Sequence, residues 1–168
     1  MLSRDAGSYL CNYLCWRAAE VSDGPRLVRM DERITGRNRG LWYERKLARA
    51  VRDSDVNVSL GAELDGVLVG AVLGAVQYGE FGIPEPVAVL DTILVDPLHM
   101  RRGIASAMLE ELASNLSRLG IDRIRTEVQW NDPLSRFLGT HGFALAPVLV
   151  LERLLFPGTP RRDEKETQ

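Results

Sequence analysis

The sequence predicts a domain of the α+β class, in which an antiparallel hairpin is combined with helices. Residues 57–64 and 67–78 are strand-like and flank Asp65-Gly66, a dipeptide typical of a tight hairpin turn. Val87–Val95 is a nearly continuous apolar run of strand length, and the next segment has helical periodicity. A chain of 168 residues, 45% hydrophobic and 26% charged, has the size and composition of one globular domain.

Residues 1–25 are predicted to form an atypical helical segment that ends before Asp23-Gly24-Pro25. Leu10, Leu14 and Ala18 would share one face of this helix, and no clear strand precedes Leu27. Residues 3–25 also weakly resemble the nucleophile segment of pyroglutamyl peptidase, with Cys11 at the place of the reactive thiol. A thiol nucleophile needs a histidine base and an orienting carboxylate. We therefore interpret Cys11 as a small buried apolar residue.

Two helices are expected next. The first runs from Arg26 to a stop at Thr35-Gly36, and the second covers residues 41–51 with Leu41, Ala48 and Val51 facing inward. The stretch Arg33–Arg39 carries three arginines, which suit either an acidic acceptor or a solvated charged loop. These arginines are Arg33, Arg37 and Arg39.

A basic, glycine-containing loop follows the apolar strand. Asp96-Pro97 ends that strand, because proline cannot donate to a β-ladder. Arg101-Arg102-Gly103 then opens a helix with Ile104, Met108, Leu109 and Leu112 on one face. Such a junction directs backbone N–H groups and the positive end of the helix dipole into one concavity. The sequence therefore predicts a phosphate or pyrophosphate site.

Beyond this helix, Gly120 is a stop, Arg123–Gln129 is a predicted strand, and Val148–Leu151 is a predicted short apolar strand. Residues 157–168 are polar and are expected to form a flexible tail.

Composition narrows the class of function. A net charge of −2 argues against a dedicated nucleic-acid binder. No apolar run has the length of a membrane span, and no signal-peptide pattern opens the chain, so a cytoplasmic location is expected. Two cysteines, Cys11 and Cys15, suit neither a disulfide framework nor a zinc site, and no metal is expected.

Several spaced elements together resemble the GNAT superfamily of acyl-CoA-dependent N-acyltransferases. Val95-Asp96-Pro97 and Met100–Ala105 match its strand and its [Q/R]-x-x-G-x-[G/A] loop, with methionine at the first loop position. Asn131 and Phe137–Phe143 resemble its second half. The resemblance covers about residues 27–155 and places the domain at 26–156. It implies a mixed, mostly antiparallel sheet that is splayed at an acetyl-CoA slot and has helices on both faces.

The resemblance also implies the ligands and their sites. Acetyl-CoA would be the co-substrate, and a primary amine of a small molecule or protein the acceptor; a homodimer is one arrangement that it allows. The backbone of Ile93, Leu94 and Val95 would pair with the pantetheine arm. The remaining implied cofactor-binding residues are Arg101, Arg102, Gly103, Ile104, Ala105, Ser106 and Asn131.

A base must remove the ammonium proton before the amine attacks the thioester. Glu127 is the first candidate and Asp91 the second, because both are acidic residues in strand-like sequence. An ion pair with Arg123 or Arg125 is the alternative explanation for each. Many members have a tyrosine where this chain has Leu138. The alternative function is therefore a catalytically degenerate CoA-binding module with a sensing or scaffold role.

Overall fold

The computed structural model describes residues 13–52, 58–78, 84–129, 131–151, 153 and 155. Its centre is a five-stranded sheet in the order β1-β2-β3-β4-β5. Neighbouring strands from β1 to β4 are antiparallel, and β5 is parallel to β4. The mixed, mostly antiparallel sheet expected from the sequence is confirmed. The strands are β1 (Leu14–Ala18), β2 (Leu60–Leu64), β3 (Val67–Gln77), β4 (Val87–Val95) and β5 (Ile124–Thr126).

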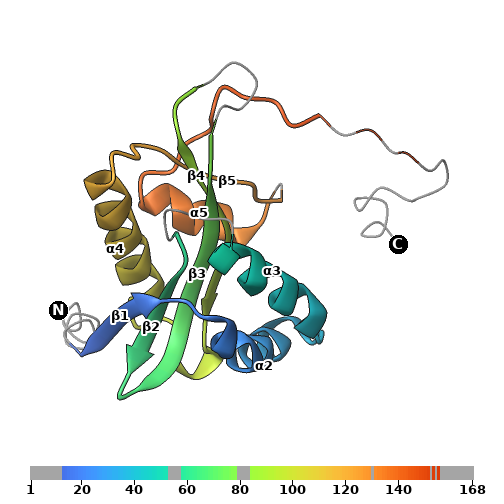
Figure 1. Ribbon diagram of the computed structural model, residues 1–168, viewed down its shortest axis with the longest axis vertical. Helices are drawn as coiled ribbons and strands as arrows, with labels where there is room; N and C mark the ends of the chain where they lie inside the picture. The colour runs from blue at the N-terminus through green and yellow to red at the C-terminus, as the bar shows by residue number, and fades with distance from the viewer. Residues whose placement is uncertain are drawn as a thin grey trace.

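Helices cover both faces of this sheet, as Figure 1 shows. On one face, α2 (Gly24–Thr35) and α3 (Gly40–Arg52) contribute Leu27, Met30, Tyr43 and Leu47 to a core against β3 and β4. On the other face lie α4 (Ile104–Arg118) and α5 (Pro133–Thr140). Two short 3-10 helices, η1 (Val21–Asp23) and η2 (Pro97–His99), connect β1 to α2 and β4 to the loop before α4.

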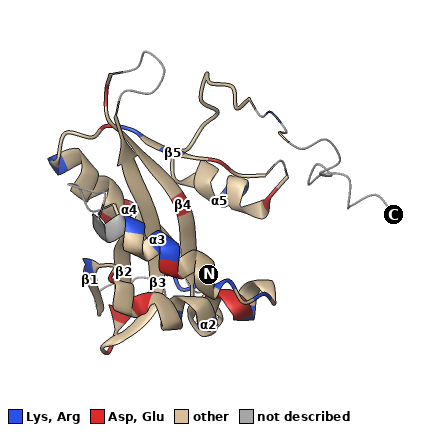
Figure 2. Cartoon of the chain, turned by 45° about the vertical axis from the view of Figure 1, so that its right-hand side comes forward, with Lys and Arg blue, Asp and Glu red and all other residues tan. Residues whose placement is uncertain are grey.

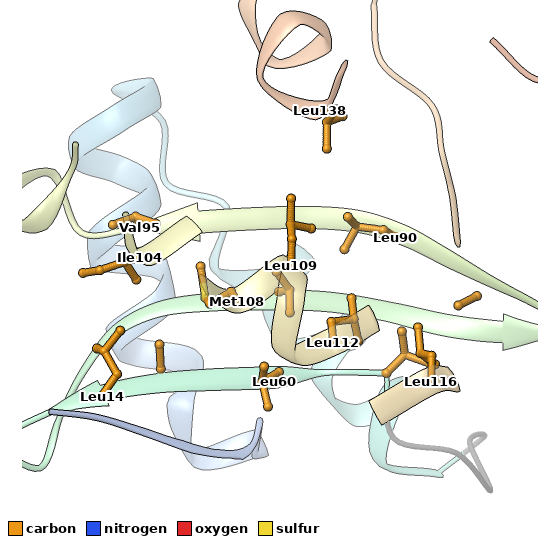
Figure 3. Packing of buried hydrophobic residues seen from close by; sticks show 14 of the residues in the cluster. Leu14, Leu60, Leu90, Val95, Ile104, Met108, Leu109, Leu112, Leu116 and Leu138 are labelled. Carbon is orange, nitrogen blue, oxygen red and sulfur yellow. The ribbon is translucent and has the colours of Figure 1, made fainter. Parts of the chain in front are cut away.

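The larger core lies between the sheet and α4 (Figure 3). Ile104, Met108 and Leu112 are at most 2% exposed, so the predicted apolar face of α4 is confirmed. The helix packs closely over β3 because Gly70 has no side chain: a Cβ there would lie 3.0 Å from the Met108 Cε. Leu138 brings α5 into the same core.

Local turn signals correspond to the observed backbone. Asp65 and Gly66 have φ values of 53° and 73°, which are the left-handed values that a type I′ hairpin turn requires. Gly36 ends α2 with φ 68°. Among the described side chains of α3, Tyr43 and Leu47 are buried, whereas Leu41, expected inside, is 72% exposed. Ala48 is half-buried, and the side chain of Val51 lies outside the described part of the chain.

The helix expected across the end of residues 1–25 is wrong at Leu14–Ala18, which form β1. This strand pairs antiparallel with β2, from Leu14 opposite Leu64 to Ala18 opposite Leu60. The i, i+4 spacing of apolar residues suggested a helix, but pairing with β2 along its free edge determines the conformation. An opening strand is therefore present before Leu27. Cys11 lies outside the described residues.

The strand expected at Val148–Leu151 is also wrong. These residues belong to no helix or strand and have no sheet partner among the described residues, and Leu149 and Leu151 are each 88% exposed. A β-branched run forms a strand only when another strand is available to pair with it. The predicted tail, residues 157–168, lies outside the described part of the chain. No helix among the described residues combines the length and apolar character needed to cross a bilayer.

Candidate functional site

Strands β4 and β5 stop pairing partway along the sheet, and the region beyond their last pair is called the slot below. Among the described residues the two strands pair over three positions. Ala88–Leu90 of β4 lie opposite Ile124–Thr126 of β5. Beyond Leu90, β4 continues to Val95 with β3 as its only sheet partner among the described residues. The register between β3 and β4 shifts at this point, because Leu73 faces Thr92 while Gly74 faces Leu90. Asp91 is therefore a bulge residue, and the extra local twist explains why the strands separate here.

The free edge of β4 offers backbone groups to a ligand. The Asp96 amide donates to the Val69 carbonyl at 2.8 Å, so the polar groups of Asp96 point toward β3. Successive residues of a strand alternate in this direction. Ile93 and Val95 therefore direct their N–H and C=O groups toward the slot, whereas Leu94 directs its own toward β3. Two of the three residues expected to contact an extended ligand arm have this orientation.

Beyond β4 and η2, a basic turn leads into the start of α4. Arg101 and Gly103 both adopt left-handed backbone conformations, with φ values of 59° and 79°. Gly103 is the N-cap of α4 and provides no side-chain cap. The first-turn amides of Ile104, Ala105 and Ser106 thus have no partner within the helix. Arg101 and Arg102, both exposed, flank these amides, so the groups that the sequence predicts for an anion site lie together at this helix start.

A buried ion pair fixes the junction between β4 and this loop, and sequence reasoning did not find it. Asp96 is 1% exposed and accepts a hydrogen bond from the Arg26 Nη2 at 2.5 Å. Its other oxygen accepts from the Leu98 amide at 3.0 Å, with the Arg33 Nη1 at 3.7 Å. The available signal was a carboxylate beside Pro97, which must be paired if it is buried. Asp96 thus joins the start of the loop to α2.

The arginine loop between α2 and α3 has structural partners. The Arg39 Nε donates to the Asp31 Oδ2 at 2.6 Å, and its Nη2 also contacts this carboxylate, which is 1% exposed. Arg33 lies beside Asp96. Burial beside Asp31 raises the pKa of the Tyr43 hydroxyl above its usual range, so Tyr43 stays neutral in the core. Arg33, which lies in α2, and Arg39 therefore pair with carboxylates of the fold, which neither of the two explanations given above predicted.

The two candidate bases have different surroundings. Asp91 accepts from the Lys46 ammonium of α3 and, at 2.9 Å, from the Thr92 hydroxyl. Glu127 is exposed and directly follows β5, on the slot side of its last paired residue. The predicted partner Arg123 lies instead 3.6 Å from Glu85 and 3.7 Å from the neighbouring Asp122.

The second half of the predicted site is carried by α5 and the turn before it. Asn131 has φ 69° in this turn, and Asp132 caps α5 by accepting from the Leu134 amide at 2.8 Å. Leu138 is 3% exposed and belongs to the core that includes Leu90 (Figure 3). The position at which many GNAT members have a tyrosine therefore carries an apolar side chain that packs into the protein.

A cavity of about 530 Å³ lies elsewhere, between α4, the chain before β5 and the end of α5, and none of the predicted site residues line it. His141 is at its wall, and the Nδ1 of this imidazole lies 3.0 Å from the Phe137 carbonyl.

A free strand edge followed by an arginine-flanked helix start suits an extended ligand that carries a phosphate group. Residues 26–143 match the model of the acetyltransferase (GNAT) family. The chain therefore belongs to this family and is an N-acetyltransferase that uses acetyl-CoA as its co-substrate. No curated protein matches the sequence.

Solved structures of low sequence identity share the fold. An aminoglycoside N-acetyltransferase in complex with CoA has a TM-score of 0.67 at 15% identity, over 85% of this chain and 95% of that one. A ribosomal-protein-alanine N-acetyltransferase from Brucella melitensis biovar Abortus 2308 gives 0.64 at 19% identity, over 84% and 99%. A transcriptional regulator from Bacillus halodurans C-125 gives 0.69 at 16% identity, over 84% and 99%.

Proposed function

We propose that the slot beside β4 holds acetyl-CoA for direct transfer of its acetyl group to a primary amine. The single observation that carries this proposal is that a free strand edge is followed along the chain by a basic turn at a helix start. The free edge of β4 at Ile93 and Val95 leads into the basic turn and first-turn amides of residues 101–106. An extended amide-containing arm fits the first surface, and a pyrophosphate fits the second.

In this proposal the chemistry needs no covalent enzyme intermediate. The neutral amine attacks the thioester carbonyl, an N–C bond forms, and the C–S bond breaks. The CoA thiolate leaves and is protonated through water, which relays the second proton that the attacking nitrogen loses. Water serves here because Leu138 offers no hydroxyl. Glu127 accepts the proton that the ammonium must lose, directly or through water. Its position beyond the last paired residue of β5, where the strands part, supports this role.

The binding half of the proposal is tested by charge reversal at the helix start. Arg102→Glu should weaken acetyl-CoA binding at least tenfold in isothermal titration, because a carboxylate would replace a cation beside the pyrophosphate. Arg118→Glu is the matched control, since it makes the same charge change at the other end of α4. Equal affinity of the two variants would contradict a pyrophosphate site at residues 101–106.

The catalytic half is tested at Glu127. Glu127→Gln should lower kcat by about 100-fold or more, the usual contribution of a general base, with little change in the KM for acetyl-CoA. Thiol release with a panel of amines measures this, and Glu110→Gln, an exposed change on α4, is the control. An unchanged kcat would exclude Glu127 as the base. Binding of acetyl-CoA without transfer to any amine would favour a sensing or scaffold role instead.

A further inference from the structure

An ion pair between α3 and β4 lies beside the slot. The Lys46 ammonium contacts the Asp91 carboxylate, and Asp91 is the bulge residue at which β4 loses contact with β5. The two side chains are 21% and 36% exposed, so the pair is neither buried nor fully solvated. Figure 2 shows the acidic band on β4 and the basic bands on α3. A ligand that reaches the open end of the slot from the α3 side can therefore contact both charges.

The Trp42 ring adjoins this ion pair and lies close to two cations, Lys46 and Arg39. The Lys46 Nζ lies 5.1 Å from the centre of the Trp42 ring, and the Arg39 Cζ lies 5.3 Å from it. Trp42 and Lys46 are four residues apart on α3 and so share a face. Trp42 is 40% exposed although it is large and apolar. Arg39 pairs with Asp31. Lys46 instead pairs with Asp91, which lies at the slot.

Resting on the proposed function, we propose that the acceptor is a small amine that also carries an anionic group. Its ammonium replaces Lys46 on Asp91, and its carboxylate or phosphate pairs with the displaced Lys46 over Trp42. One ion pair is thereby exchanged for two complementary pairs. A polycationic acceptor has no anionic group to pair with Lys46. It would compete with Lys46 for the Asp91 carboxylate and leave the lysine beside another positive charge.

The experiment compares acceptors that differ in the anionic group. γ-Aminobutyrate and butylamine have amines of similar basicity, and spermidine represents the polycations. The wild-type protein should acetylate γ-aminobutyrate with a kcat/KM at least about tenfold above that for butylamine, because a charge-assisted contact is added. Lys46→Met should reduce this ratio to near one while butylamine is still acetylated. Lys46→Gln is a second variant in case methionine disturbs packing on Trp42.

Arg45→Met is the matched control, since it removes an exposed cation next to Lys46 on the outer side of α3 and should preserve the ratio. Equal kcat/KM for the two amines in the wild-type protein, or a preference that survives in both Lys46 variants, would overturn the inference. Either result would leave acetyl transfer itself intact. Failure of the proposed function is distinguishable from this, because no amine would then be acetylated.

Discussion

The ion pair Arg26–Asp96 allows the clearest test of the interactions that hold the loop between β4 and α4. Arg26→Met removes the guanidinium and leaves the carboxylate of Asp96, 1% exposed, with the Leu98 amide at 3.0 Å and the Arg33 Nη1 at 3.7 Å. Breaking a buried pair by removing one partner costs about 3–5 kcal/mol. Because the Arg26 side chain is 25% exposed and Arg33 remains, we expect the lower end, about 3 kcal/mol.

Asp96→Asn should cost less than Arg26→Met. The asparagine carbonyl can still accept from the Leu98 amide, and no charge is left buried, so the loss is about 2 kcal/mol, that of a hydrogen bond to a charged group. The double variant should consequently be no less stable than Arg26→Met alone. Urea unfolding of the four proteins, with unchanged m values, measures this cycle.

The reasoning would be refuted if the double variant lost the sum of the two single effects, about 5 kcal/mol, because additivity means that the two side chains do not interact. Acetyl-CoA titration adds a second readout. Both single variants should bind more weakly than the wild type at temperatures where they remain folded, since the start of the loop would no longer be joined to α2.

Two further predictions concern the sheet and its first connection. Gly74→Ala should lower the free energy of unfolding by about 2 kcal/mol, because the new Cβ would lie 2.4 Å from the backbone oxygen of Val89. Gly139→Ala, where nothing lies within 4 Å, should be neutral or slightly stabilising in the same urea assay, and equal losses would contradict the clash. The pKa of Asp23 is lowered: burial alone would raise it, but hydrogen bonds from Arg17 and the Glu20 amide outweigh that effect. As the pH falls, the Asp23 carboxyl therefore binds a proton in the unfolded chain before it does so in the folded protein. The stability that the ionised Asp23 contributes is complete above its ordinary pKa of 3.8. This stability is lost as the pH falls through the lower pKa that Asp23 has in the folded protein. Asp23→Asn should make urea unfolding less sensitive to acid, and an unchanged slope of stability against pH would contradict this account.

Elements with strong local signals were predictable. Pro97 ends β4, the spacing of Ile104, Met108 and Leu112 defines the buried face of α4, and Gly103 marks the start of that helix. Each signal is read from a few consecutive residues, since the backbone conformation of proline and glycine and the helical period are local properties. The prediction of an anion site at this helix start has the same origin.

The failures concern strands and ion pairs. Leu14–Ala18 has helical spacing yet pairs with β2, and Val148–Leu151 has strand composition yet pairs with no described strand. Strand formation depends on a partner that is distant in sequence, so composition alone cannot determine it. The sequence shows that Leu138 stands where many GNAT members have a tyrosine, but only the structure shows that the Leu138 side chain belongs to the core.

The sequence by itself thus determined the family and the order of β4, loop and α4, and it predicted a pyrophosphate site at the start of that helix. Only the tertiary structure decided that β4 separates from β5 at Asp91, that Lys46 pairs with this carboxylate across 45 residues, and that Arg26 reaches Asp96 across 70. The physical reason is the range of the interactions. Caps, turns and helical periods act between neighbours, whereas a bulge, a strand edge and an ion pair exist only where folding brings distant residues together.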